Sequence, residues 1–287
     1  MAPNRIVHGK IEGLVIALNY PLRSEKQPSQ QLILDIANAL EPSIQAAGEA
    51  IVQLYHQPEH RVQTKQDQTP VTEADLASHD LLVDALQRLT PAWPVVSEED
   101  SAQHQASRPV QSIRESVTPY WLIDPLDGTR EFIARTGEFS INIGLVVGQE
   151  AYFGILYGPI QGILYRGGIG LAAERKTRDE PVWHPIHCRS RPQRGGIQIS
   201  SRRSSPPPPS EHPMQQTHLG SALKFGRIAE GNADLYVRRG PTMEWDTCAG
   251  HAIVEAAGGE VQCLDGGPLR YGKAEWRNKG FVVRGRA

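Results

Sequence analysis

The sequence has few of the features that assign a chain to a secreted, membrane or nucleic-acid-binding class. Its three cysteines are widely spaced and odd in number, which argues against a disulfide framework and fits a reducing cytosol. No stretch approaches the roughly 18 consecutive apolar residues of a membrane-spanning helix. The formal net charge of −2 provides no overall positive field for nucleic acid or acidic membranes. We therefore expect a cytoplasmic protein that binds any phosphorylated ligand through a local site.

Residues 1–28 lack the pattern of a packed element. Arg5 and Lys10 precede a short apolar run, as they would in a signal peptide, but Glu12 interrupts the run and no small-residue cleavage site follows. We expect a loosely ordered N-terminal extension. Contact of this extension with the inner membrane stays open as an alternative.

The rest of the chain is long enough for one large domain or two closely joined lobes. Hydrophobic residues make up 39% of the sequence and charged residues 22%, as in ordinary globular enzymes. From about Ser29 onward apolar residues recur near helical spacing, and Pro42 either kinks this helix or marks its first turn. A second helix is expected to follow Thr72 as its N-cap and to end at Pro91.

Strand-like runs come next and then alternate with shorter helices. The runs 140–148 and 151–158 predict an antiparallel hairpin. The charged residues 172–183 predict a surface connection, and 200–213, with four consecutive prolines, predict an exposed polyproline-like loop. The order of elements indicates an α+β fold of stacked helix and sheet layers in two lobes, 29–183 and 184–287.

Five carboxylates stand at the ends of expected elements, where side chains can converge: Asp75, Glu98, Asp124, Asp127 and Asp246. Taken singly, each has a structural explanation. Thr72 and Asp75 resemble a capping box, and Asp246 could be an N-cap. The run from Asp124 to Gly128 has the composition of a turn. Taken together, buried carboxylates without cations would repel one another, so bound metal is the natural compensation. Carboxylate and carbonyl oxygens suit Mg²⁺, and the carbonyl of Leu126 is available between the two aspartates.

Two other acidic motifs are excluded. An EF-hand loop starting at Asp124 would need Asp or Asn at 126 and Glu at 135, where the chain has Leu126 and Arg135. A phosphatase of the haloacid dehalogenase type places a nucleophilic Asp two residues before the second Asp. That position is Pro125, so a phospho-aspartate mechanism fails here.

Three separated motifs, VVSEED, WLIDPLDGTREF and WDTCAGHAIVEAAGG, resemble in order and spacing the signatures of the inositol monophosphatase superfamily, a group of lithium-sensitive, Mg²⁺-dependent phosphatases. The resemblance implies the layered α-β-α-β-α sandwich of the inositol monophosphatase and fructose-bisphosphatase type. The segments KQDQTPVTEAD and GSALKFGRIAEGNADLYVRRGPT are similar to the bisphosphate nucleotidase branch. This branch removes the 3′-phosphate from adenosine 3′,5′-bisphosphate and serves sulfur metabolism. The resemblance covers residue 31 to the end.

The resemblance also implies roles for individual residues. Two or more Mg²⁺ ions would be bound by Glu98, Asp124, Leu126 (through its carbonyl), Asp127 and Asp246. The catalytic residues would be Asp75, Thr129 and Glu98, with Asp75 and Thr129 orienting or deprotonating the attacking water. Substrate contacts would come from Glu98, Leu126, Asp127, Gly128, Thr129, Arg130, Ser221, Lys224, Arg238 and Asp246.

Some alternatives stay open at this point. Lys224 is interpreted equally well as a ligand for the second phosphate of the nucleotide or as a solvated helix lysine. Arg238 and Arg239 alternate on an expected strand, so one should face the site and the other solvent. An inositol- or sugar-phosphate phosphatase of the same fold, or a non-catalytic ligand-binding member, is the competing interpretation. The expected partner is a small phosphorylated nucleotide and not a nucleic acid, and the oligomeric state is open.

Overall fold

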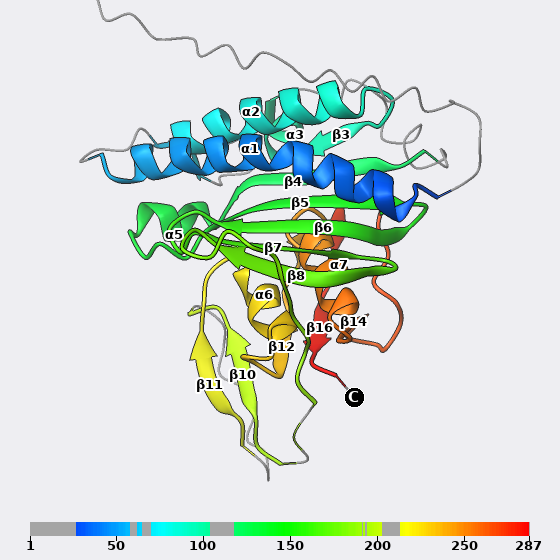
Figure 1. Cartoon of the computed structure of the whole chain (residues 1–287). Helices are drawn as coiled ribbons and strands as arrows, with labels where there is room; N and C mark the ends of the chain where they lie inside the picture. Colours follow the sequence, from blue (N-terminus) through cyan, green and yellow to red (C-terminus); the bar gives the residue numbers. More distant parts are fainter. Residues whose placement is uncertain are drawn as a thin grey trace, which may run out of the picture.

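The computed structural model in Figure 1 describes residues 27–57, 62–64, 70–103, 118–190, 192, 194–202 and 213–286. The predictions for nearly all of the N-terminal extension and for the proline-rich loop therefore lie outside the described residues. Within these ranges, no helix is long and apolar enough to cross a membrane.

The helices and strands follow one another in the order that the sequence predicts, helices first, then strands, then alternating elements. The helices are α1 (Gln30–Tyr55), α2 (Glu73–Leu89), α3 (Glu98–Gln103), α5 (Thr129–Ile133), α6 (Leu223–Ala229) and α7 (Cys248–Ala256). The strands up to the proline-rich loop are β1 (Val62–Thr64), β2 (Pro70–Thr72), β3 (Val95–Ser97), β4 (Tyr120–Asp127), β5 (Ser140–Val147), β6 (Glu150–Gly158), β7 (Ile163–Gly168), β8 (Leu171–Thr177), β9 (His184–Pro185) and β10 (Ile197–Ser200). The later strands are β11 (Gln215–His218), β12 (Leu235–Arg238), β13 (Thr242–Met243), β14 (Glu260–Cys263), β15 (Arg277–Asn278) and β16 (Phe281–Arg284).

Helices α1 and α2 form the first layer, and local signals define their ends. The Ser29 hydroxyl accepts the Leu32 N–H at 3.2 Å and caps α1, whose apolar positions are buried while Pro42 remains inside the helix. Thr72 and Asp75 form a capping box at the start of α2, which ends at Leu89. Both predicted helices are confirmed.

A seven-stranded sheet packs beneath these helices in the order β3-β4-β5-β6-β7-β8-β9. Strands β3 and β4 are parallel and every later neighbour is antiparallel, which confirms the predicted hairpin of β5 and β6. The prediction of a surface connection over 172–183 is wrong for its first half, which is strand β8. Its charged side chains are neutralised by partners: Glu174 pairs with Arg166 on β7, and Lys176 pairs with Glu41 on α1.

Alternation along β4 directs successive side chains to opposite faces of this sheet. Trp121 and Ile123 belong to the apolar cluster shared with α1 and α2. Tyr120 and Leu122 belong to the cluster on the other face, shared with α6 and α7. The next side chain on the Leu122 face is Asp124, so the strand pattern turns this carboxylate toward α7.

Glycines let α7 lie very close to that face. A Cβ on Gly144 of β5 would lie 2.5 Å from Cys248 Sγ, and a Cβ on Gly154 of β6 would collide with the Ala249 carbonyl. Cys248 and Ala249 form the first turn of α7. The glycines therefore allow the segment before this turn, which carries Asp246, to approach the sheet.

A second sheet of five strands, in the order β11-β10-β12-β16-β14, completes the described layers. Helices α6 and α7 lie between the two sheets (Figure 1). The predicted layered α/β fold is confirmed as helix pair, sheet, helix pair, sheet.

Candidate active site

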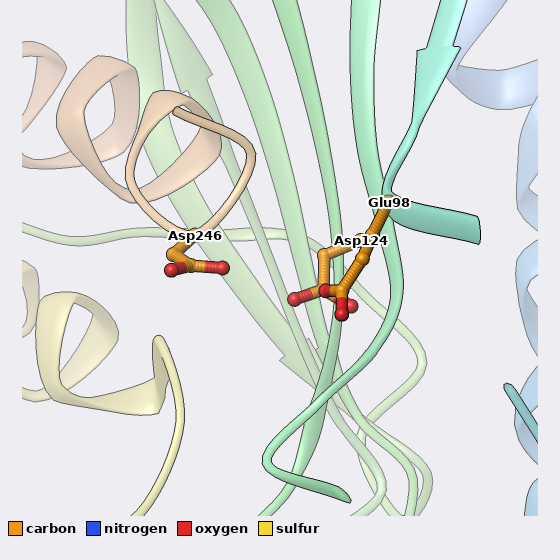
Figure 2. A group of neighbouring side chains, drawn as sticks. All are labelled: Glu98, Asp124 and Asp246. Carbon is orange, nitrogen blue, oxygen red and sulfur yellow. The ribbon is translucent and has the colours of Figure 1, made fainter. Parts of the chain in front are cut away.

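Three carboxylates from distant parts of the chain lie together, one just after β3, one near the end of β4 and one before α7. Glu98 directly follows β3, which runs parallel to β4 with Ser97 beside Ile123, so Glu98 is brought next to Asp124. Asp246 lies just before α7. One carboxylate oxygen from each of Glu98, Asp124 and Asp246 lies within 4.8 Å of the others (Figure 2).

Burial and mutual repulsion make this cluster a site for positive charge. Asp124 is only 2% exposed, and burial, followed by the charges of Glu98 and Asp127, raises its pKa well above the usual value. Burial, followed by the charges of Asp127 and Glu98, raises the pKa of Asp246 to about 7. Carboxylates that repel one another in this way bind a cation favourably, because the cation removes both costs.

Asp127 belongs to the same acidic group but also binds the C-terminal part of the chain. Its Oδ2 accepts the Ala222 N–H at 2.5 Å and the Asn142 amide at 3.2 Å. A register shift in the pairing of β4 with β5 lies between Asp124 and Asp127. The shift breaks the strict alternation of β4, so that both aspartates reach one site although Pro125 and Leu126 separate them.

The short Pro125–Leu126 segment is held by hydrogen bonds from both sides. The Ser78 hydroxyl donates to the Pro125 carbonyl at 2.8 Å, and the Leu126 N–H donates to Asp124 Oδ1 at 3.0 Å. The Leu126 carbonyl lies 3.4 Å from the Thr129 hydroxyl. These contacts fix the orientation of Asp124 before any ligand binds.

Asp75 and Thr129 form a second pair beside the acidic cluster. The Thr129 hydroxyl donates to Asp75 Oδ1 at 3.1 Å. Asp75 Oδ2 accepts the Thr72 N–H at 2.8 Å and the Thr72 hydroxyl at 2.6 Å. The capping box predicted for Asp75 is thus present, but it uses one oxygen and leaves the other to orient Thr129. The structural and the chemical interpretation of Asp75 are compatible.

The turn after Asp127 leads directly into the short helix α5. Gly128 has φ +96°, a conformation that glycine adopts without strain, and α5 begins at Thr129. Arg130 in the first turn of α5 is exposed. The first N–H groups of a helix have no partner within it, so this turn can bind an anion beside the carboxylates.

Lys224 is buried, and the alternative of a solvated helix lysine is wrong. Its side chain is 4% exposed, its Nζ donates to the carbonyls of Leu219 and Ser221, and it lies 5.2 Å from the centre of the Tyr236 ring. Burial lowers its pKa to about 8, while the charge of Asp127 acts in the opposite direction. Every residue of α6 except Arg227 is buried, so Arg227 occupies the one solvated position of this short helix.

The other predicted substrate contacts lie around Lys224. Ser221 has φ +50°, a strained conformation for a residue with a Cβ, in the loop whose next N–H reaches Asp127. Arg238 is half-buried and its charge acts on Lys224, whereas Arg239 is exposed. Arg238 is therefore the member of the pair that faces the site.

Asp246 is not an N-cap, contrary to the structural alternative for it. The N-cap of α7 is Thr247. Asp246 Oδ2 accepts the Met243 N–H at 2.9 Å and the Thr242 hydroxyl, which holds the carboxylate toward the cluster.

The sequence analysis missed two residues that contact the site: Asn142, which donates to Asp127, and Ser78, which donates to the Pro125 carbonyl. A polar residue at an inward position of the apolar strand β5 was the available signal for Asn142.

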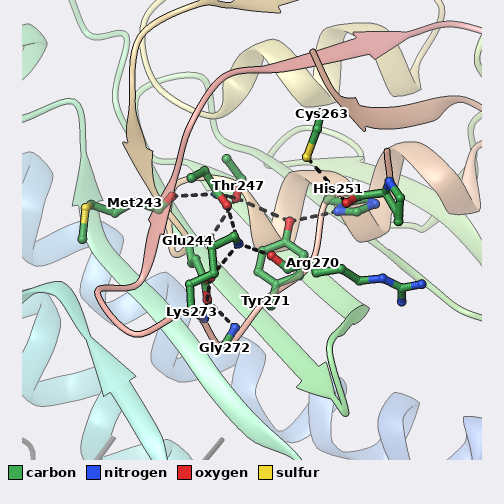
Figure 3. A network of polar contacts seen from close by, with 11 residues as sticks. Met243, Glu244, Thr247, His251, Cys263, Arg270, Tyr271, Gly272 and Lys273 are labelled. Carbon is green, nitrogen blue, oxygen red and sulfur yellow. Dashed lines mark hydrogen bonds and ion pairs between the residues drawn. The ribbon is translucent and has the colours of Figure 1, made fainter. Parts of the chain in front are cut away.

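A buried polar network, shown in Figure 3, holds the segment that carries Asp246. Glu244 is fully buried and accepts the Gly272 N–H at 2.7 Å, the Lys273 N–H at 3.0 Å and the Lys273 ammonium at 2.8 Å. Thr247 accepts the Asn278 amide at 2.9 Å. Asp246 therefore lies between two anchored residues, Glu244 and Thr247.

We expect Glu244→Ala to lower the free energy of unfolding by about 3–5 kcal/mol, because it removes the partner of a charge and leaves two backbone donors unsatisfied. Urea unfolding measures this loss. The Mg²⁺ concentration needed for half-maximal activity should rise as well, since the Asp246 turn loses an anchor. The matched control is Glu150→Ala, which breaks an exposed pair with Arg270 and should change stability by less than about 1 kcal/mol. Equal losses in the two variants would contradict the role of the network.

Comparisons with known proteins agree with this arrangement. The model of the inositol monophosphatase family matches residues 34–283. The chain is 41% identical over 244 residues to the 3′(2′),5′-bisphosphate nucleotidase CysQ of Escherichia coli strain K12, a match that covers 83% of this chain and 94% of the relative. It is 34% identical over 240 residues to the protein of the same name from Haemophilus influenzae, covering 82% of this chain and 87% of the relative.

Among solved structures, CysQ from Bacteroides thetaiotaomicron, a bacterial member of the inositol monophosphatase family, is similar with a TM-score of 0.73. It is 33% identical in sequence, and the match covers 88% of this chain and 98% of that one. The matched family model spans both sheets and all the carboxylates described above. The chain belongs to the inositol monophosphatase family.

Proposed function

We propose that this protein is a Mg²⁺-dependent 3′(2′),5′-bisphosphate nucleotidase that converts adenosine 3′,5′-bisphosphate to AMP and phosphate. The observation that carries the phosphatase chemistry is the convergence of Glu98, Asp124 and Asp246 within 4.8 Å, with the Thr129–Asp75 pair beside them. The substrate is supported by the names of the relatives, which cover most of both chains.

The donor set fits Mg²⁺. It consists of carboxylate oxygens, with the Leu126 carbonyl nearby, and contains none of the thiolate or imidazole ligands that zinc prefers. Glu98, Asp124, Asp127, Asp246 and the Leu126 carbonyl would hold two or more ions. When bound, Mg²⁺ neutralises charge on phosphoryl oxygens and lowers the pKa of a water ligand.

The residues of the chain supply orientation and proton transfer. Asp75, fixed by Thr72, accepts the Thr129 hydroxyl, so the lone pairs of that hydroxyl are free to accept a hydrogen bond from water. A proton leaving the water passes to Thr129 as the Thr129 proton moves to Asp75. The new bond joins the water oxygen to phosphorus, and the bond from phosphorus to the ribose 3′-oxygen breaks. That oxygen takes up a proton from solvent, and Asp75 returns its proton to solvent.

The other groups hold the substrate. The N–H groups of Gly128, Thr129 and Arg130 would bind the scissile phosphate at the start of α5. Ser221, Lys224 and Arg238 lie on the C-terminal side of the site, where the nucleotide would extend. Because Lys224 is buried, it acts by holding the loop of Ser221 through two carbonyls and by balancing the charge of Asp127.

A phosphate-release panel tests the proposal. Adenosine 3′,5′-bisphosphate, inositol 1-phosphate and fructose 1,6-bisphosphate are compared with Mg²⁺, with EDTA, and with Mg²⁺ plus lithium. We expect the nucleotide to be the preferred substrate, activity to require Mg²⁺, and lithium to inhibit. Rapid turnover of inositol 1-phosphate with an inert nucleotide would show that the substrate is wrong while the phosphatase chemistry holds. No turnover of any substrate would favour a non-catalytic member of the family.

A further inference from the structure

Glu138 lies where the two loops that flank Asp127 meet. Its side chain is 12% exposed, and Oε2 accepts the Gly220 N–H at 2.9 Å while Oε1 pairs with the Arg202 guanidinium. The Glu138 carbonyl blocks the position of a Cβ on Gly220 and lies 3.3 Å from that of a Cβ on Gly128. Glu138 thus touches both the turn at Gly128 and the loop that reaches Asp127 through the Ala222 N–H.

Arg202 is held by this carboxylate at the edge of the candidate active site. Its side chain is 60% exposed, so its pair with Glu138 is open to solvent. Only the guanidinium side of the pair is exposed, so another anion can reach Arg202, while the Glu138 carboxylate keeps its hydrogen bond from the Gly220 N–H. The guanidinium has five N–H donors, and one carboxylate does not use all of them. Arg202 is therefore available to a second anion without disturbing the fold.

Two cations of the predicted substrate site, Lys224 and Arg238, are committed to other contacts. The Lys224 ammonium is buried and donates to the carbonyls of Leu219 and Ser221. Arg238 is half-buried and donates from Nη2 to the Pro241 carbonyl at 3.1 Å. Arg202 differs from both because its described partner is a charged, exchangeable group. An anionic part of the substrate that extends past the Gly220 loop would lie near this guanidinium, because Glu138 binds both the Gly220 N–H and Arg202.

We propose that Arg202 determines specificity by exchanging Glu138 for the second, non-scissile phosphate of a bisphosphate nucleotide. The inference rests on the proposed function and names the residue that distinguishes a bisphosphate from a monophosphate. A phosphate dianion offers Arg202 more charge than the carboxylate does, and it accepts two parallel N–H bonds from one guanidinium. Arg202 binds the substrate and takes no part in the chemical step.

Two substrates separate this role from a structural one. Adenosine 3′,5′-bisphosphate carries the second phosphate and adenosine 3′-phosphate lacks it, while the scissile group is the same. For Arg202→Ala we expect kcat/KM for the bisphosphate to fall about 10- to 100-fold, mainly through a higher KM. A loss of this size corresponds to the contribution of one charged hydrogen bond. The value for the monophosphate should stay within about threefold, and Arg202→Lys should recover part of the loss.

Arg88→Ala is the matched control. Arg88 is 64% exposed and pairs with Asp84 on the surface of α2, far along the helix from Asp75. This variant should change kcat/KM for neither substrate. Glu138→Gln keeps an oxygen for the Gly220 N–H but removes the charge that competes for Arg202. It should leave the KM for the bisphosphate unchanged or lower it.

Each other outcome overturns the inference in a recognisable way. Equal losses on both substrates in Arg202→Ala would indicate that the arginine only supports the fold of the site. Unchanged values on both would indicate a surface ion pair without a function. A rise in the KM of Glu138→Gln that matches Arg202→Ala would make the ion pair itself the required element. A wild-type enzyme that hydrolyses neither nucleotide would overturn the proposed function and this inference with it.

Discussion

Asp124→Asn should reduce phosphate release by at least about 10³-fold while the protein stays folded. Asparagine has nearly the same shape, and its side-chain oxygen can still accept the Leu126 N–H that Asp124 Oδ1 accepts at 3.0 Å. The substitution removes the most buried charge of the cluster, so the affinity for Mg²⁺ falls. Phosphate release is measured at saturating and at raised Mg²⁺, together with urea unfolding.

The stability of this variant gives an independent test. Without metal, burial and the charges of Glu98, Asp127, Asp246 and Asp75 all oppose the ionised form of Asp124. The metal-free variant should therefore be at least as stable as the metal-free wild type, although it is almost inactive. The control is Asp84→Asn, which removes an exposed carboxylate from α2 and should change neither property. Undiminished activity of Asp124→Asn would refute its role as a metal ligand.

Local signals in the sequence were sufficient for most of the fold. The caps of α1 and α2 and the β5–β6 hairpin depend on residues close together in the chain, so they could be predicted. Strand β8 could not, because the partners that neutralise its charges are remote. Lys176 pairs with Glu41, which lies on α1 at the start of the described chain.

The same distinction applies to the candidate site. The carboxylates could be predicted because each stands at the end of an element and sheet geometry gathers such ends. The state of Lys224 could not, since α6 is buried on nearly all sides and carries no amphipathic pattern that separates buried from exposed positions. The role of Glu244, two residues before Asp246, could not be predicted either, because its partner Lys273 comes from a later loop.

Without divalent metal, the protein should lose stability as the pH rises from 5 to 7.5. The pKa of Asp246 is about 7 in the folded protein, against 3.8 for the ordinary group, and that of Asp124 is also raised. Between these values the folded state keeps protons that the unfolded chain has released, so stability is greatest at low pH and falls as the folded groups are forced to ionise. For Asp246 alone the fall between pH 5 and 7.5 is about 2–3 kcal/mol.

Urea unfolding in EDTA across this pH range measures the fall in stability. The whole range lies below the pKa of Lys224, which is about 8. Saturating Mg²⁺ should reverse the sign of the dependence, because the ion binds the deprotonated carboxylates and its affinity rises with pH. Asp246→Asn should flatten the metal-free curve, since the group that titrates near 7 is gone. Metal-free stability that rises from pH 5 to 7.5, equally in wild type and Asp246→Asn, would contradict the cluster of repelling carboxylates. The two opposite slopes would arise from the same buried oxygens, which are destabilising without a cation and bind one tightly because of that cost.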